Sequence, residues 1–119
     1  MRVIKSENIK FFDIDGTLIL PYTTGPAIYV YDAVTRKDIK MQAHEPNVRL
    51  LLEEKHRGST IIVWSMGGYE WAANVVRALN LVTKVDFVMS KPLAYFDDVP
   101  IDEWLRFRVF LDPNMKYKR

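Results

Sequence analysis

Three short apolar runs separated by helical segments constrain the fold of this 119-residue chain more than any other feature. The first run, residues 9–14, lacks a clean alternation of polar and apolar residues, which is typical of a strand buried on both faces of a parallel sheet. Further strands are predicted over 60–65 and 85–90. Helices are predicted over 45–58 and 67–80, so the order of elements indicates a parallel α/β sheet with right-handed crossovers.

The remaining elements are less sharply marked. Between the first run and the first helix, about residues 18–43, lies a segment with a different pattern. Its part 27–42 begins with β-branched and aromatic residues, passes through a polar centre and ends in alternating apolar and polar residues. This pattern predicts a β-hairpin flap outside the central sheet. Fourth and fifth strands are predicted, from weaker patterns, over 93–96 and 106–111.

Length and composition bound the class of protein. The length fits one compact domain over residues 1–119. The chain has no cysteine, so disulfides, cysteine zinc sites and thiol catalysis are excluded. We find no signal-peptide pattern and no apolar stretch that could span a bilayer, and therefore expect a cytoplasmic protein without a membrane partner. A net charge of +2 is too small to indicate nucleic-acid binding by itself.

Polar side chains follow the predicted strands at the end where parallel α/β sheets bind their ligands. These residues are Asp13, Ser65, Lys91 and the adjacent pair Asp97 and Asp98. We therefore expect them to contribute to one site.

Two acids close the first strand. Asp13 and Asp15 flank Ile14, and residues two apart in an extended chain point to the same side, so both carboxylates are expected to face one site. Gly16 lets the backbone turn sharply, and Thr17 adds a hydroxyl. Neighbouring carboxylates repel unless a cation or a proton intervenes, which suits Mg²⁺ or a division of labour between acid and base. Taken alone, the pattern also describes a loop whose carboxylates cap a helix.

The longer string FFDIDGTL, residues 11–18, resembles the first motif of the haloacid dehalogenase (HAD) superfamily, an apolar strand ending in Asp-x-Asp-Gly-Thr. Three further motifs of that family have counterparts here in the same order. IIVWS is similar to the second and ends at Ser65, and Lys91 in FVMSKP takes the place of the third. YFDDVPID is similar to the fourth and supplies three acids: Asp97, Asp98 and Asp102.

The resemblance implies catalytic and metal-binding roles. Asp13 would be the nucleophile that forms an aspartyl-phosphate. Asp15 would protonate the leaving oxygen, activate the attacking water and lend its backbone carbonyl to Mg²⁺. Asp98 would be the direct metal ligand of the fourth motif, with Asp97 as a supporting or second ligand. Asp102 would bind through water or orient Lys91.

The phosphoryl group would be bound by a second set of residues. Ser65 would donate a hydrogen bond to a phosphoryl oxygen, and Lys91 would pair with both that group and Asp13. The sequence departs from the commonest second motif, because Met66 follows Ser65 where a small polar residue is more usual. Backbone N–H groups of Met66 and Gly67 are expected to replace the missing side-chain contact. Thr17 completes the expected phosphate-binding residues.

The resemblance also implies a fold and a kind of substrate. The expected fold is a three-layer, Rossmann-like HAD fold with a small hairpin flap after the first strand. The segments between the motifs are too short for a cap domain, so the site is expected to be open, or closed by a neighbouring subunit of an oligomer. An open site tolerates large substrates such as phosphorylated protein, nucleic-acid ends or polysaccharide.

These implications define one expected function and two alternatives. The chain is expected to be a Mg²⁺-dependent phosphomonoester hydrolase. The first alternative is a polynucleotide 3′-phosphatase or a phosphotransferase with the same residues. The second is a non-catalytic HAD-like domain that serves binding or assembly, because fold and motif do not by themselves determine function.

Four aromatic residues have two interpretations each. Tyr69 and Trp71 follow the second motif and are placed either to stack on a base or to pack in the helix core, with core packing favoured for Trp71. Tyr29 and Tyr31, on the flap, either line the entrance to the site or cover the core.

Overall fold

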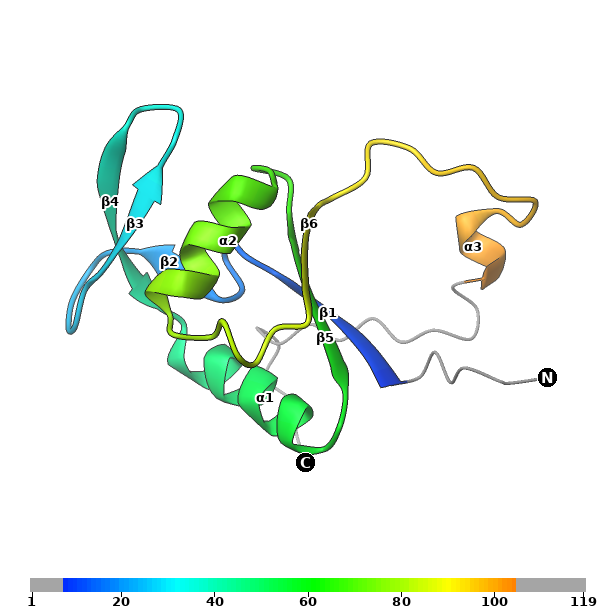
Figure 1. Ribbon diagram of the computed structural model, residues 1–119, viewed down its shortest axis with the longest axis horizontal. Helices are drawn as coiled ribbons and strands as arrows, with labels where there is room; N and C mark the ends of the chain where they lie inside the picture. Colours follow the sequence, from blue (N-terminus) through cyan, green and yellow to red (C-terminus); the bar gives the residue numbers. More distant parts are fainter. Residues whose placement is uncertain (1–7, 105–119) are drawn as a thin grey trace.

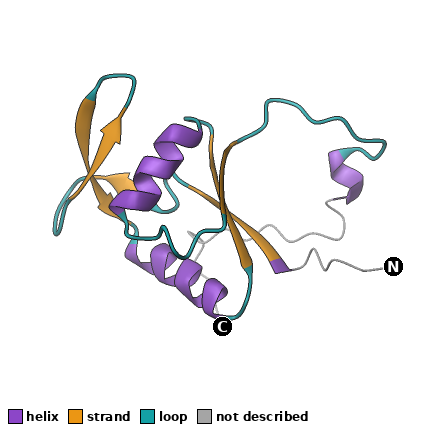
Figure 2. Ribbon diagram, viewed as in Figure 1, coloured by secondary structure: helices purple, strands orange, loops and turns teal. Residues whose placement is uncertain are grey.

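The computed structural model describes residues 8–104 and shows an α/β fold with two small sheets (Figures 1 and 2). The central sheet is parallel and has the strand order β1 (Ile9–Asp13), β5 (Thr60–Ser65), β6 (Phe87–Ser90). The α/β class and the parallel sheet predicted from the sequence are confirmed. The three predicted apolar runs coincide with these three strands.

The register of the central sheet aligns the carboxyl ends of its strands. Asp13, the last residue of β1, is opposite Trp64, and Ser65, the last residue of β5, is opposite Ser90, the last residue of β6. Lys91 follows Ser90 directly. Because backbone pairing fixes these positions, the polar residues at the strand ends meet at one edge of the sheet.

Two helices cover the central sheet. Helix α1 (Glu45–His56) precedes β5, and helix α2 (Tyr69–Ala78) connects β5 with β6. Both crossovers step in the same direction across the sheet, and right-handed crossovers then put both helices on one face. Figure 1 draws both helices on the same side of the strands.

The core lies between these helices and the sheet. Its buried members include residues of α1, α2, the alternate positions of β5, β1 and the segment that leads into the flap, with Leu51, Val75, Ile61 and Val63 fully buried. The alternation in β5 leaves Trp64 half-buried on the opposite face, where its ring lies 4.4 Å from that of Phe11.

The flap is an antiparallel sheet with the strand order β2 (Ile19–Pro21), β4 (Lys37–Ala43), β3 (Ile28–Asp32). The predicted hairpin is therefore present and gains a third strand, β2, from the segment that follows the first motif. Val30 of β3 is fully buried in the common core. Asn74 of α2 donates from Nδ2 to the backbone carbonyl of Tyr31 at 2.8 Å, which fixes the flap against α2.

The segment after β6 has a different character. Residues 91–100 contain no strand or helix, and α3 (Ile101–Trp104) is one short turn of helix. The strand predicted over 93–96 is wrong, because Leu93 and Phe96 are fully exposed and no strand pairs with this segment in the described part of the chain. The strand predicted over 106–111 lies outside the described residues. None of the helices within residues 8–104 has the length and hydropathy needed to cross a membrane.

Candidate active site

The centre of the candidate site is an ion pair between the first and third strands of the central sheet. Lys91 Nζ lies 3.3 Å from Asp13 Oδ1, and each side chain is about one-third exposed. The backbone N–H of Lys91 donates to the carbonyl of Ser65 at 2.9 Å. This bond continues the pairing of β6 with β5, so the sheet itself aims Lys91 across β5 toward Asp13.

The loop after β1 places the second acid. Ile14 is fully buried between the two acids, and its carbonyl accepts hydrogen bonds from the backbone N–H groups of the next turn. Gly16 has a φ of 80°, a left-handed conformation that a side chain would strain. Anchoring Ile14 leaves Asp13 partly exposed and Asp15 exposed on either side of it.

A buried asparagine supports this loop from α1. Asn47 Nδ2 donates to the backbone carbonyl of Thr17 at 2.8 Å, and the residue is 2 % exposed. A buried amide must satisfy its hydrogen bonds, so its position ties the turn after Asp15 to the first helix. Thr17 is thus placed in the loop beside the acids, with its backbone occupied by Asn47. No pattern in the sequence singles out Asn47.

Asp15 has a direct partner on α2. Trp71 donates from Nε1 to Asp15 Oδ1 at 3.2 Å. Trp71 is half-buried and packs against the core, as its helical spacing predicts. Its indole N–H nevertheless reaches the site, so it has a second role as the side chain that orients Asp15.

The turn after β5 uses the Gly67 N–H for a bond within the turn, so this group is not free to bind phosphate as predicted from the sequence. Ser65 is 1 % exposed, and its Oγ accepts a hydrogen bond from the Gly67 N–H at 3.0 Å. A Cβ on Gly67 would lie 3.3 Å from Ser65 Oγ and 3.4 Å from Trp71 Cδ1, so glycine suits this turn. Met66 is exposed. The Ser65 hydroxyl still has its own proton to donate, because a hydroxyl both donates and accepts.

Ser90 supports the start of α2. Its Oγ accepts a hydrogen bond from the Tyr69 N–H at 2.9 Å, while the residue that precedes the helix, Gly68, has no side chain for a cap. The last residue of β6 therefore satisfies an N–H group at the start of α2. Tyr69 itself is exposed, and core packing does not account for its ring.

The acids of the fourth motif are not brought to this edge. No group of three potential metal-binding side chains exists among residues 8–104, so Asp97 and Asp98 do not join Asp13 and Asp15 as the family pattern implies. Asp102 lies in α3, and Figure 1 shows the segment that leads to it arching away from the sheet. The physical reason is that backbone pairing, which aligns the other motifs, ends at β6.

Asp97 instead accepts a hydrogen bond within its own turn. The Val99 backbone N–H donates to Asp97 Oδ1 at 2.9 Å. This bond, followed by a contribution from Asp98, lowers the pKa of the exposed Asp97 carboxyl below its ordinary value. Both effects arise within a short turn and need no other part of the fold.

The residues that do converge are compatible with Mg²⁺. This ion prefers oxygen ligands and usually retains several waters, with only one or two carboxylates from the protein. Asp13 supplies one carboxylate, and the backbone carbonyl of Asp15, which stays available while the Asp15 side chain carries a proton, supplies a second oxygen from the same short segment. The donor set therefore fits a Mg²⁺ ion that completes its coordination with water and substrate oxygens.

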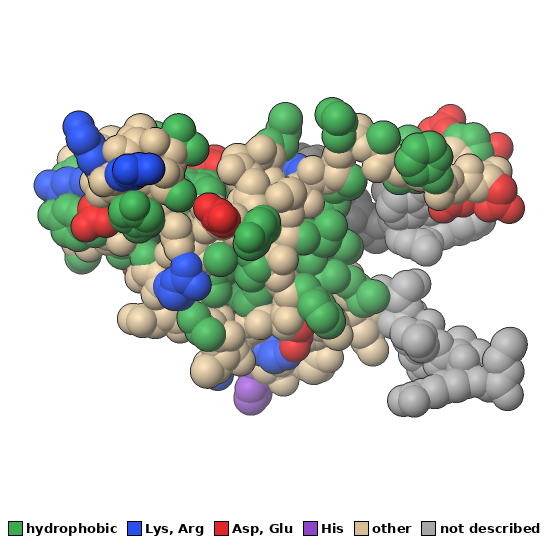
Figure 3. All heavy atoms as spheres, turned by 45° about the horizontal axis from the view of Figure 1, so that its top comes forward, with side chains coloured by type: hydrophobic (Ala, Val, Ile, Leu, Met, Phe, Trp, Pro, Cys, Tyr) green, Lys and Arg blue, Asp and Glu red, His purple; other side chains and the backbone are tan. Residues whose placement is uncertain are grey.

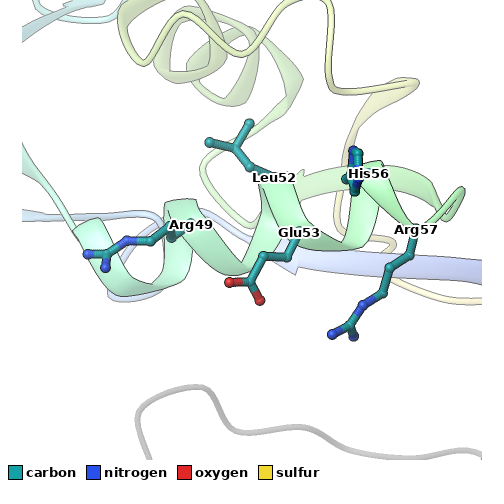
Figure 4. A pocket seen from close by; sticks show the side chains of 5 residues that line it. All are labelled: Arg49, Leu52, Glu53, His56 and Arg57. Carbon is teal, nitrogen blue, oxygen red and sulfur yellow. The ribbon is translucent and has the colours of Figure 1, made fainter.

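A separate hollow lies on the outer surface of α1 and is lined by Arg49, Leu52, Glu53, His56 and Arg57 (Figure 4). All five residues come from this helix or its C-terminal cap, and they include neither of the acids nor the lysine of the strand-end site.

Comparisons of this chain with protein-family models, with curated protein sequences and with solved structures find no match.

Proposed function

We propose that this protein is a Mg²⁺-dependent phosphomonoester hydrolase with Asp13 as its nucleophile. The observation that carries the proposal is the contact between Lys91 Nζ and Asp13 Oδ1 at the carboxyl edge of the central sheet, next to Ser65. Three of the four HAD-like motifs predicted from the sequence supply these residues. We further propose that the parallel sheet belongs to a three-layer, Rossmann-like HAD fold.

In the first step, a carboxylate oxygen of Asp13 attacks the phosphorus atom, and the bond between phosphorus and the ester oxygen breaks. Asp15 transfers its proton to the departing alkoxide, which leaves as an alcohol. Asp13 then carries the phosphoryl group as an acyl phosphate. Lys91 is placed to neutralise the negative charge that otherwise keeps a carboxylate and a phosphate apart.

In the second step, water attacks the phosphorus atom of the acyl phosphate and breaks its bond to the Asp13 oxygen. The deprotonated Asp15 accepts the proton of that water, so both side chains return to their starting states as inorganic phosphate leaves. Trp71 holds Asp15 in place through its N–H in both steps. The Asp13 carboxylate and the Asp15 backbone carbonyl would hold Mg²⁺, which would supply additional charge neutralisation.

Phosphate oxygens would be received by groups at the turn after β5. The Ser65 hydroxyl is held by its bond from Gly67 and keeps a proton to donate. Met66 and Gly67 are exposed, so a phosphate would approach this turn from solvent. Thr17, in the loop beside the acids, offers a further hydroxyl.

The proposal is tested with a broad panel of phosphoesters, with and without Mg²⁺. We expect Mg²⁺-dependent release of inorganic phosphate from at least one class of phosphomonoester. Absence of turnover on the whole panel, with Mg²⁺ bound to a folded protein, would favour a non-catalytic binding domain instead.

A further inference from the structure

The outer face of the flap is an exposed surface of aromatic and basic side chains. In an antiparallel sheet, directly opposite residues point to the same face. Tyr29 is opposite Lys40, and Tyr31 is opposite Asp38. Tyr22 joins them because Lys40 Nζ lies 4.0 Å from the centre of its ring. We call these three tyrosines and Lys40 the tyrosine face.

Core packing does not explain these rings. The opposite side of the flap faces the core, where Val30 is fully buried and Ile28 and Met41 pack against the buried cluster. On the tyrosine face, by contrast, Tyr29 is 59 % exposed and Tyr31 is 47 % exposed. Exposed rings grouped on one face of a sheet are characteristic of a binding surface.

The charges around the rings favour an anionic partner. Lys40 is flanked by Tyr22 and Tyr29, and Arg36 and Lys37 lie where β3 and β4 are joined. Figure 3 shows basic and hydrophobic side chains together over the flap. The nearby acid Asp32 keeps its negative charge but is directed into the turn, where its carboxylate accepts hydrogen bonds from the Val34 N–H and the Thr35 hydroxyl. Asp38 remains as an acidic side chain opposite Tyr31.

We propose that the tyrosine face binds single-stranded nucleic acid. Its bases would stack on Tyr29 and Tyr31, and its phosphates would pair with Lys40 and the basic residues of the turn. Stacking on aromatic rings tolerates any base, because every base has a π face, whereas duplex ends offer few unstacked bases. The surface therefore selects single strands without selecting a sequence.

The test uses a fluorescein-labelled oligothymidylate of eight nucleotides with hydroxyl groups at both sugar ends, titrated with the full chain and followed by anisotropy. Without a terminal phosphate the probe offers no phosphomonoester, so a failure here is distinct from a failure of the proposed hydrolase. We expect binding that weakens as salt is added, because phosphate contacts release counterions. A duplex of the same length should bind several-fold more weakly.

Matched variants locate the binding surface. The double variant Tyr29→Ala/Tyr31→Ala should raise Kd by about tenfold or more, given the usual contribution of a stacked base. Tyr29→Phe should retain binding, because it keeps the ring. Tyr95→Ala is the control, because Tyr95 is also 47 % exposed but lies on the segment after β6.

Several outcomes would overturn the proposal. They are absence of binding by the wild-type protein, unchanged affinity in the folded double alanine variant, and an equal loss in Tyr95→Ala. If the duplex bound more tightly than the single strand, the contact would be electrostatic and would not involve stacking of bases on the tyrosines. Retention of the fold in each variant is checked by circular dichroism.

Discussion

The residues at the carboxyl edge of the central sheet contact one another, whereas the acids of residues 97–102 lie on an exposed segment away from that edge. Lys91 is the boundary between the two regions: its backbone is still bonded to Ser65, and its side chain reaches Asp13. A few residues further on, Leu93 and Phe96 are fully exposed. The difference teaches that a sequence motif specifies a position in space only where pairing or burial fixes the backbone that carries it.

The largest expected effect concerns Asp13, the proposed nucleophile at the carboxyl edge of the central sheet. Asp13→Asn keeps the shape of the side chain and removes the attacking oxygen anion, so turnover should fall by about 10⁴-fold or more. Steady-state kinetics on the best ester of the panel measures the loss, and trapping the wild type with beryllium fluoride reports the acyl-phosphate site. Full activity in a folded Asp13→Asn protein would remove the covalent mechanism.

The second effect concerns Asp15 and depends on the leaving group. Asp15→Asn retains the backbone and removes the transferable proton, so phosphorylation of Asp13 should slow by about 10²–10⁴-fold with alkyl phosphates and much less with nitrophenyl phosphate. Single-turnover kinetics on both esters separates the first step from hydrolysis of the intermediate. Equal slowing for both esters would mean that Asp15 is not the general acid.

A smaller effect is expected when Asp15 loses its partner. Trp71→Phe keeps a ring in the core and deletes the N–H that donates to Asp15 Oδ1. A hydrogen bond to a neutral group contributes about 0.5–1.5 kcal/mol, so a loss of up to roughly tenfold on alkyl phosphates is expected. Nitrophenyl phosphate should be less affected, which a general loss of packing would not produce.

Asp86 and Asp97 both accept a hydrogen bond from a backbone N–H group, and they should differ in how much they contribute to the free energy of unfolding. Asp86 accepts from the Ile61 N–H at 2.8 Å and from Lys55 at 2.9 Å, which joins α1, β5 and the residue before β6. Among residues 8–104, the contacts of Asp97 come from Val99 and Asp98 in its own turn. Asp86→Asn should lower the free energy of unfolding by about 1–2 kcal/mol, after allowance for its partial exposure, and Asp97→Asn should leave it unchanged.

The effect of Asp86 should also depend on pH. The Ile61 N–H, followed by Lys55, lowers the pKa of Asp86 below its ordinary value of 3.8. Its stabilisation is therefore complete above that value and disappears as the pH falls through the lower pKa of the folded state. Urea denaturation of wild type and Asp86→Asn should show a full difference at neutral pH that shrinks below about pH 4. A difference that is constant down to pH 2 would contradict this assignment.

The smallest effect, on Mg²⁺ affinity, is expected for a substitution in the fourth motif. The result tests whether the acids of that motif lie away from the sheet edge. In the observed arrangement Asp98→Ala should change Mg²⁺ affinity by less than about twofold, as for a surface substitution remote from the site. Isothermal titration calorimetry measures it, with Asp13→Asn as the positive control. A tenfold loss in Asp98→Ala would show that residues 91–100 return to the sheet edge, as the family pattern implies.

The central sheet could be predicted because its strands are continuous apolar runs between amphipathic helices. The strand ends then placed Asp13, Ser65 and Lys91 together without knowledge of any contact. The strand predicted over 93–96 failed because an apolar string becomes a strand only when a partner strand is available. Composition alone does not reveal that partner.

The supporting contacts of the site could not be predicted. Asn47, Ser90 and Asn74 are polar residues of ordinary type, and each acquires its role from a backbone group far away in the sequence. Trp71 was correctly assigned to the helix core. The direction of its N–H depends on the rotation of α2 about its axis, which spacing does not fix to the necessary precision.

One face of α2 has a mechanical consequence. Trp71 contacts Asp15, and Asn74, one turn further along the same face, contacts the backbone of the flap at Tyr31. One helical turn therefore separates the side chain that holds Asp15 from the side chain that holds the flap. A change in the position of α2 would alter both contacts together.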